Sequence, residues 1–106
     1  MNKLQSSVVL LALGALAGAP AEAHTPLFDC FDNGDKTITC EGGFSDGASA
    51  EGVVIRVLDA QGKVLEQREL DASGSVTMAR PEGEFSVSFT AGTDHSITVL
   101  GDDIVE

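Results

Sequence analysis

Tryptophan and tyrosine are absent from this chain of 106 residues, and phenylalanine occurs only five times. Sites that stack nucleic-acid bases, and flat surfaces that bind sugars, are built from aromatic side chains. The shortage of aromatic residues therefore argues against both kinds of site. Cationic side chains are also scarce, because six Lys and Arg oppose 17 Asp and Glu and leave a net charge of −11. Nucleic-acid affinity comes mainly from Lys and Arg that displace counterions. The composition therefore predicts no nucleic-acid partner.

The same composition bears on catalysis. Carboxylates are numerous, but glycosidases surround their pair with a deep cleft, which a short chain without Trp or Tyr has little material to build. A length of 106 residues sets a ceiling of one domain. We predict a single domain that is not an enzyme.

Residues 1–23 have the pattern of a secretory signal peptide. Lys3 gives the positive start and residues 8–19 form an apolar run, which is shorter than the roughly 20 residues of a membrane span. Ala21-Glu22-Ala23 is a small-x-small cleavage site, which favours a cut between Ala23 and His24. A rival cut after Ala21 would begin the mature chain at Glu22.

Cleavage after Ala23 removes 23 of the 106 residues and leaves 83. The net charge stays at −11, because Lys3 and Glu22 are lost together. We expect residues 24–106 to form one periplasmic or secreted domain with no membrane span.

Cys30 and Cys40 are the only cysteines. Cysteines in an even number usually pair in an oxidising compartment, so export predicts a Cys30–Cys40 disulfide that stabilises the fold by about 2–3 kcal/mol. Two buried free thiols are the alternative. A zinc site is disfavoured, because the chain has no C-x-x-C pair and only two His.

The residues between the cysteines carry two conflicting signals. A two-residue Asn33-Gly34 turn would leave the cysteines three positions out of register and on opposite faces, where no disulfide forms. Direct pairing of the cysteines instead sets Asp32 opposite Ile38 and widens the loop to residues 33–37. We favour the bridge and the wider loop.

Period-two alternation of apolar and polar residues dominates the rest of the chain and predicts short antiparallel strands. The expected strands are residues 27–31, 36–41, 53–58, 63–67, 75–78, 84–90 and 96–100. Turn signals at regular spacing between them predict an all-β fold, a small Ig-like or transthyretin-like antiparallel β-sandwich of six or seven strands. The expected core comprises Phe28, Ile38, Phe44, Val53, Ile55, Val57, Val64, Leu65, Val76, Met78, Phe85, Val87, Phe89, Ile97 and Val99.

The longest stretch without a strand pattern is residues 42–52, which holds four glycines and one apolar anchor, Phe44. We expect a flexible connection here. Long loops are a common place for contacts with a partner.

Residues 52–59, 62–65, 70–74 and 81–87 alternate strand and turn signals in a particular order. That order resembles the transthyretin-like, carboxypeptidase-regulatory-like and Cna-B-like β-sandwich modules. The resemblance implies the sandwich fold and a role as a spacer, a partner-binding domain or a transporter accessory. It does not extend to the isopeptide chemistry of Cna-B relatives, because Asn33, the only Asn after residue 23, lies in a predicted turn.

The layout of the whole chain has a second likeness. An export signal followed by His24 and a small acidic sandwich resembles the periplasmic accessory components of nickel and cobalt uptake transporters. More distantly, it resembles copper-binding proteins whose mature chain begins with His. The likeness implies a transition-metal site near the new N-terminus.

Two imidazoles are available for such a site. His24 at a free N-terminus offers its α-amine and a ring nitrogen to one ion, which suits Cu(II) or Ni(II). His95, with Asp94 beside it, adds a third nitrogen and a carboxylate. Because Pro26 blocks a continuous amide chelate, the site needs both histidines. Each histidine can also be explained without a metal. His24 would then stand at the mature N-terminus by coincidence alone, and a loop residue such as His95 is most often simply solvated.

The sequence thus predicts a periplasmic metal-handling or accessory binding protein, associated with a membrane transporter component. His24, His95 and Asp94 would hold one divalent nickel, cobalt or copper ion. The alternative is a structural or partner-binding sandwich with no ligand, which would use an exposed sheet edge or the loop at residues 42–52.

Overall fold

The computed structural model describes residues 25–92 and 96–106, which form seven strands and one short 3₁₀ helix. In chain order these are β1 (Pro26–Asp32), β2 (Thr37–Phe44), β3 (Val54–Asp59), β4 (Val64–Glu69), β5 (Ser75–Ala79), β6 (Phe85–Thr90), β7 (Ser96–Leu100) and η1 (Gly101–Asp103). Every expected strand is present. The largest difference is at the end of β2, which runs on to Phe44. No helix within these residues is long and apolar enough to cross a membrane.

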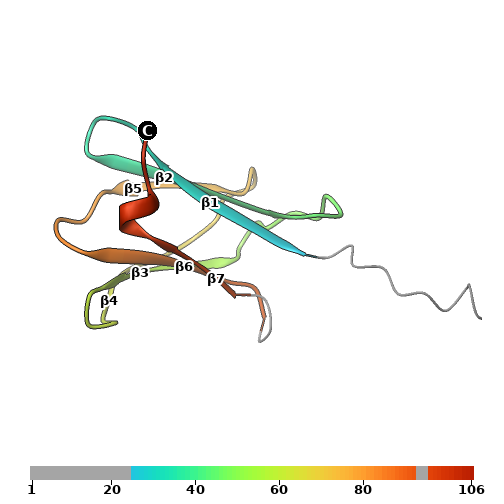
Figure 1. The fold of residues 1–106 in the computed structure, drawn as a ribbon. Coiled ribbons are helices and arrows are strands. Elements are labelled where there is room, and N and C mark those ends of the chain that lie inside the picture. The colour runs from blue at the N-terminus through green and yellow to red at the C-terminus, as the bar shows by residue number, and fades with distance from the viewer. Residues whose placement is uncertain (1–24, 93–95) are drawn as a thin grey trace, which may run out of the picture.

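The strands form two antiparallel sheets that pack face to face (Figure 1). One sheet has the order β1-β2-β5 and the other has the order β4-β3-β6-β7. The predicted all-β sandwich is therefore confirmed. Its strand order matches the constant-type Ig sandwich, except that the fourth strand pairs with the third instead of joining the first sheet.

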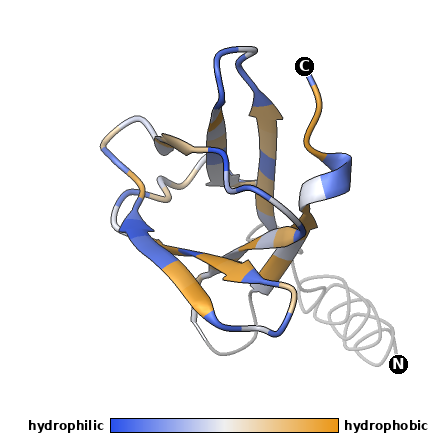
Figure 2. Cartoon of the chain, turned by 90° about the vertical axis from the view of Figure 1, so that its left-hand side faces the viewer, coloured by the Kyte–Doolittle hydropathy of each residue, from blue (hydrophilic) through white to orange (hydrophobic). Residues whose placement is uncertain are grey.

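The core lies between the sheets and is filled by alternate residues of the strands. Apolar residues lie along the strands, while hydrophilic residues gather in the turns (Figure 2). Eight expected core residues are buried: Ile38, Ile55, Val57, Val76, Met78, Phe85, Val87 and Phe89. Five more pack against them while partly exposed: Phe28, Phe44, Val53, Ile97 and Val99.

Two residues expected in the core lie on the surface. Val64 and Leu65 are 46% and 50% exposed, because β4 is an edge strand and its register with β3 shifts at a bulge. Conversely, Ala50, Leu70 and Ile104 are buried without having been predicted. Each lies outside the strands, where alternation gives no signal.

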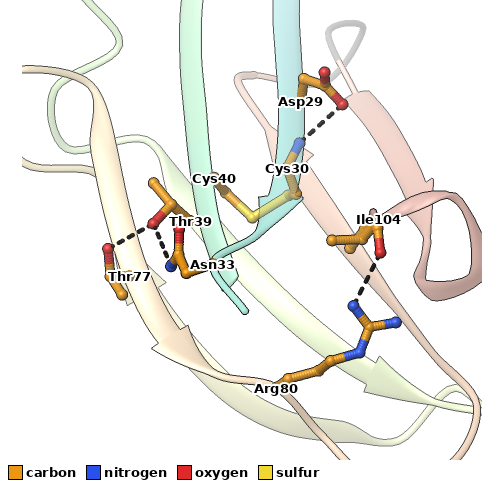
Figure 3. Close-up of a disulfide and its surroundings, with 8 residues drawn as sticks. All are labelled: Asp29, Cys30, Asn33, Thr39, Cys40, Thr77, Arg80 and Ile104. Carbon is orange, nitrogen blue, oxygen red and sulfur yellow. Dashed lines mark hydrogen bonds between the residues drawn. A yellow bond between two sulfur atoms is a disulfide. The ribbon is translucent and has the colours of Figure 1, made fainter. Parts of the chain in front are cut away.

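The disulfide fixes the register of the first hairpin. Cys30 and Cys40 are directly opposite and bonded (Figure 3), and Asp32 faces Ile38 as predicted for the wider loop. The loop itself spans residues 33–36, and the Asp32 carboxylate accepts a 2.7 Å hydrogen bond from the Gly34 N–H. The predicted bridge and register are both confirmed, and the bridge joins neighbouring strands of one sheet.

The C-terminal residues close one side of the sandwich. After η1, Ile104 is buried and the Val105 carbonyl accepts a 3.0 Å hydrogen bond from the Asp32 N–H at the free edge of β1. Figure 1 shows the C-terminus lying beside the β1–β2 loop. The last residues of the chain therefore act as a short extension of the first sheet.

The segment at residues 42–52 is more regular than the sequence indicates. Its first three residues complete β2, and the Phe44 ring lies 6.1 Å from the Phe89 ring, so this anchor is confirmed. Beyond it, local hydrogen bonds shape the chain: Ala48 N–H donates to the Asp46 carboxylate and Glu51 N–H donates to the Ser49 hydroxyl.

Candidate functional site

The three residues of the predicted metal site, His24, Asp94 and His95, lie outside the described residues. Within residues 25–92 and 96–106, no group of three or more His, Cys, Asp or Glu side chains is arranged to hold a metal ion. The metal site and its nickel, cobalt or copper ion stay a prediction from the sequence. Cys30 and Cys40 are 3% and 0% exposed, which suits a structural bridge.

Residues 43–47 spell G-x-S-x-G, the pattern of the nucleophile elbow in α/β-hydrolases. An elbow is a sharp turn from a strand into a helix. Here β2 runs into a turn with no α-helix in the described part of the chain after it. The Ser45 hydroxyl accepts a 3.0 Å hydrogen bond from the Thr25 N–H. The pattern does not form an elbow in this fold.

An open hollow of about 800 Å³ lies at the end of β2. We call it the Gly43 hollow. Leu27, Asp29, Glu41 and Gly43 of the β1–β2 ladder line it, together with residues 47–50 and residues 72–74. In the ladder these four residues form two directly opposed pairs, Leu27 with Gly43 and Asp29 with Glu41. Since alternate residues Cys30 and Cys40 face the core, the four side-chain positions face outward.

Two neighbouring glycines of β2 differ sharply in their surroundings. A Cβ on Gly42 would lie 2.7 Å from the Phe89 ring and 2.9 Å from a Leu70 methyl group, so packing requires glycine there. A Cβ on Gly43 would meet no atom within 4 Å. Gly43 also lacks a positive φ, so neither packing nor backbone conformation requires a glycine at this position.

The cost of Gly43 argues for a role. Glycine inside a strand is less stable than Ala by about 0.5–1 kcal/mol, and it often marks a place where a ligand or another backbone approaches closely. The opposite side chain, Leu27, is 53% exposed. An exposed leucine therefore lies beside bare backbone in the lining of the hollow.

One wall of the hollow is a tight turn at residues 71–74. The Asp71 carboxylate accepts hydrogen bonds from the Ser73 hydroxyl and from the N–H groups of Ser73 and Ser75. The Ser73 hydroxyl, followed by these N–H groups, lowers the pKa of Asp71 from its ordinary value of 3.8. Gly74 has a positive φ of 80° and a Cβ there would lie 2.6 Å from the Gly42 carbonyl oxygen. The turn is thus fixed closely against β2.

The hollow carries negative charge. Asp29 and Glu41 are exposed and directly opposite each other, an arrangement in which like charges destabilise a sheet. One Asp29 oxygen accepts a 2.9 Å bond from the Cys30 N–H (Figure 3). Within the described residues the ion pairs are Arg68–Glu66 and Arg80–Asp32, so no cation of this part of the chain neutralises Asp29 or Glu41.

No protein-family model, curated protein or solved structure matches this chain. The site is therefore defined by geometry alone. Sequence reasoning placed contacts in the loop at residues 42–52, but it missed the hollow. The sequence feature that marks the hollow is the Gly42-Gly43 doublet. Two consecutive glycines are typical of a loop, but here β2 continues through both of them.

Proposed function

We propose that this protein is an exported β-sandwich module that binds a partner protein through the Gly43 hollow. The partner presents an extended segment with a basic side chain. Its backbone lies over Gly43, an apolar side chain packs on Leu27, and the basic side chain reaches Asp29 and Glu41. Export remains a prediction from the signal-peptide pattern at residues 1–23 and is supported by the disulfide.

The observation that carries this proposal is the open position at Gly43, where a strand gives up stability and no part of the described chain fills the space. A strand glycine often marks a close approach of another backbone, and extended peptides commonly bind at an exposed sheet edge, such as that of β1, with side-chain pockets giving specificity. Asp29 and Glu41, which no cation of the described residues neutralises, supply that specificity, because a Lys or Arg of the partner would relieve the repulsion between them.

The test uses two fluorescent nonapeptides that alternate Leu with Lys or Leu with Glu. We expect the Lys peptide to bind, the Glu peptide not to bind, and Gly43→Val to abolish binding, because a branched side chain would cover the backbone against which the peptide lies. Thr98→Val is the matched control, because it places the same side chain at an exposed strand position on the other sheet.

Charge is tested separately. Glu41→Gln should weaken Lys-peptide binding about tenfold, because it removes one charge-assisted contact worth about 1.4 kcal/mol. Glu84→Gln changes the net charge equally at an exposed position outside the hollow and should leave binding unchanged. Equal binding by the parent and Gly43→Val would exclude the hollow as the site.

The metal-handling function predicted from His24, His95 and Asp94 is a separate hypothesis. Its residues lie outside the described part of the chain, so the geometry favours neither this function nor a transporter component as partner. The metal site is tested by the metal titration described in the Discussion.

A further inference from the structure

The outer face of the four-stranded sheet consists of three rows of paired residues. The first row is Val64, Leu58, Ser86 and Leu100; the second is Gln67, Arg56, Ser88 and Thr98; the third is Glu69, Val54, Thr90 and Ser96. The alternate residues of β3 and β6 are buried in the core. The three rows therefore point away from the core, and we call them the outer face.

The outer face differs from the rest of the molecule in charge. It holds one cation, Arg56, and one carboxylate, Glu69, so its net charge is zero in a chain whose net charge is −11. Five of its residues are Ser or Thr. Its first row is mainly apolar, with Val64 and Leu100 exposed at the two edges of the sheet. Because the excess carboxylates lie elsewhere, two copies of this chain repel each other less through this face than through surfaces that carry those carboxylates.

The face is also complementary to itself. A twofold axis parallel to the strands, between β3 and β6, would set β3 of one copy over β6 of the other and β4 over β7. Val64 would then meet Leu100 of the second copy, so the apolar rows coincide. Arg56 would meet Ser88, and Glu69 would meet Ser96. No like charges are opposed, and sheets packed in this aligned way are a common arrangement.

We infer that the protein associates with a second copy of itself through the outer face, with the Gly43 hollow of each copy left free on the opposite sheet. The inference is independent of the partner proposed for the hollow. The negative charge outside the face opposes association at long range, so the dimer should strengthen as salt screens this repulsion.

The inference is tested by sedimentation equilibrium of the protein purified after export, in the form that the cell produces. We expect a monomer–dimer equilibrium between about 10 µM and about 1 mM, with a larger association constant at about 0.5 M than at about 0.05 M NaCl. Leu100→Glu should lower the association constant about tenfold or more, because each copy would bury a carboxylate against Val64 of the other. Ser88→Glu tests the centre of the face in the same way.

Leu27→Glu is the matched control, since Leu27 and Leu100 are exposed to 53% and 57% on edge strands of different sheets. It makes the same change in charge and should leave association unchanged. Circular dichroism confirms that each variant is folded. A parent that stays monomeric at the highest concentration and salt overturns the inference. So does a dimer that Leu27→Glu weakens as much as Leu100→Glu, or one that neither Leu100→Glu nor Ser88→Glu weakens.

Discussion

Arg80 donates a 2.8 Å hydrogen bond from Nη1 to the Asp32 carboxylate, and this pair joins the end of β5 to the end of β1. The same guanidinium donates to the carbonyl oxygens of Ile104 and Gly101 at 2.9 Å and 3.1 Å (Figure 3 shows the Ile104 bond). It also lies 5.3 Å from the centre of the Phe85 ring. A single side chain thus fastens the C-terminal segment to both sheets.

We expect Arg80→Lys to lower the free energy of unfolding by about 2 kcal/mol, because a single ammonium cannot replace a planar fork that serves three acceptors. Arg80→Ala should cost at least as much, since Asp32 and two carbonyl groups then lose their partner. Urea unfolding measures both. Arg68→Lys is the control, because its pair with Glu66 is exposed and should contribute at most about 1 kcal/mol. Equal effects of the two Lys variants would contradict the role given to Arg80.

Removal of the disulfide by Cys30→Ala with Cys40→Ala should lower the free energy of unfolding by about 2–3 kcal/mol, since an open chain gains conformational freedom when it unfolds. Both sulfurs are buried, so a thiol reductant should cleave the bond far faster in urea than in the native protein. Mass spectrometry after thiol alkylation follows both rates. Rapid cleavage in the native state would show that the bridge is accessible.

The glycine doublet predicts opposite outcomes at neighbouring positions. Gly42→Ala should destabilise the fold by about 1–3 kcal/mol, because the new methyl group overpacks the core against Phe89 and Leu70. Gly43→Ala should be neutral or stabilising by up to about 1 kcal/mol, because it removes the cost of a strand glycine. Thermal unfolding distinguishes them, and destabilisation by Gly43→Ala would mean that the position is not open.

The turn beside the hollow should make stability depend on pH. Because hydrogen bonds lower the pKa of Asp71 from 3.8 in the folded state, its ionised form stabilises the fold above that value. This contribution is lost as the pH falls below 3.8 through the lowered pKa. We expect the unfolding free energy of Asp71→Asn to fall less steeply over this acid range than that of the parent. Parallel curves from urea unfolding at each pH would contradict the prediction.

The metal hypothesis has its own test. Intact mass of the exported protein reads its N-terminal residue, and titration with Ni(II), Co(II) and Cu(II) then measures affinity. If His24 is the free N-terminus and the site exists, His24→Ala and His95→Ala should each lose tight binding. A chain that begins at Glu22, or a His24→Ala variant that keeps its affinity for Ni(II) or Cu(II), would refute the site.

The sequence predicts most of the fold because its signals are local. Alternation in segments such as Phe85–Thr90 specifies a strand and its buried face together. Pairing of Cys30 with Cys40 predicts the correct register between β1 and β2, whereas a two-residue Asn-Gly turn alone would predict a wrong one. Val64 and Leu65 were predicted wrongly, because alternation identifies an apolar face but cannot show whether another layer covers it.

The candidate site was less accessible to the sequence. Gly42 and Gly43 are the same residue type, so the sequence cannot distinguish them. Only the folded structure shows that Gly42 packs against Phe89 and Leu70, whereas Gly43 has open space above it. The carboxylates of Asp29 and Glu41 are twelve positions apart and meet only through the hairpin register. Arg80 gives no sequence signal of its role, since its acceptors come from β1 and from the C-terminal segment.

The sequence by itself determined the strands, the first hairpin and the disulfide, because each depends on residues close together along the chain. Tertiary structure alone decided which strands share a sheet, since pairs such as β2 with β5 and β3 with β6 join distant segments. It also decided which surfaces stay open. Burial depends on the layer that packs above a residue, and that layer comes from another part of the chain.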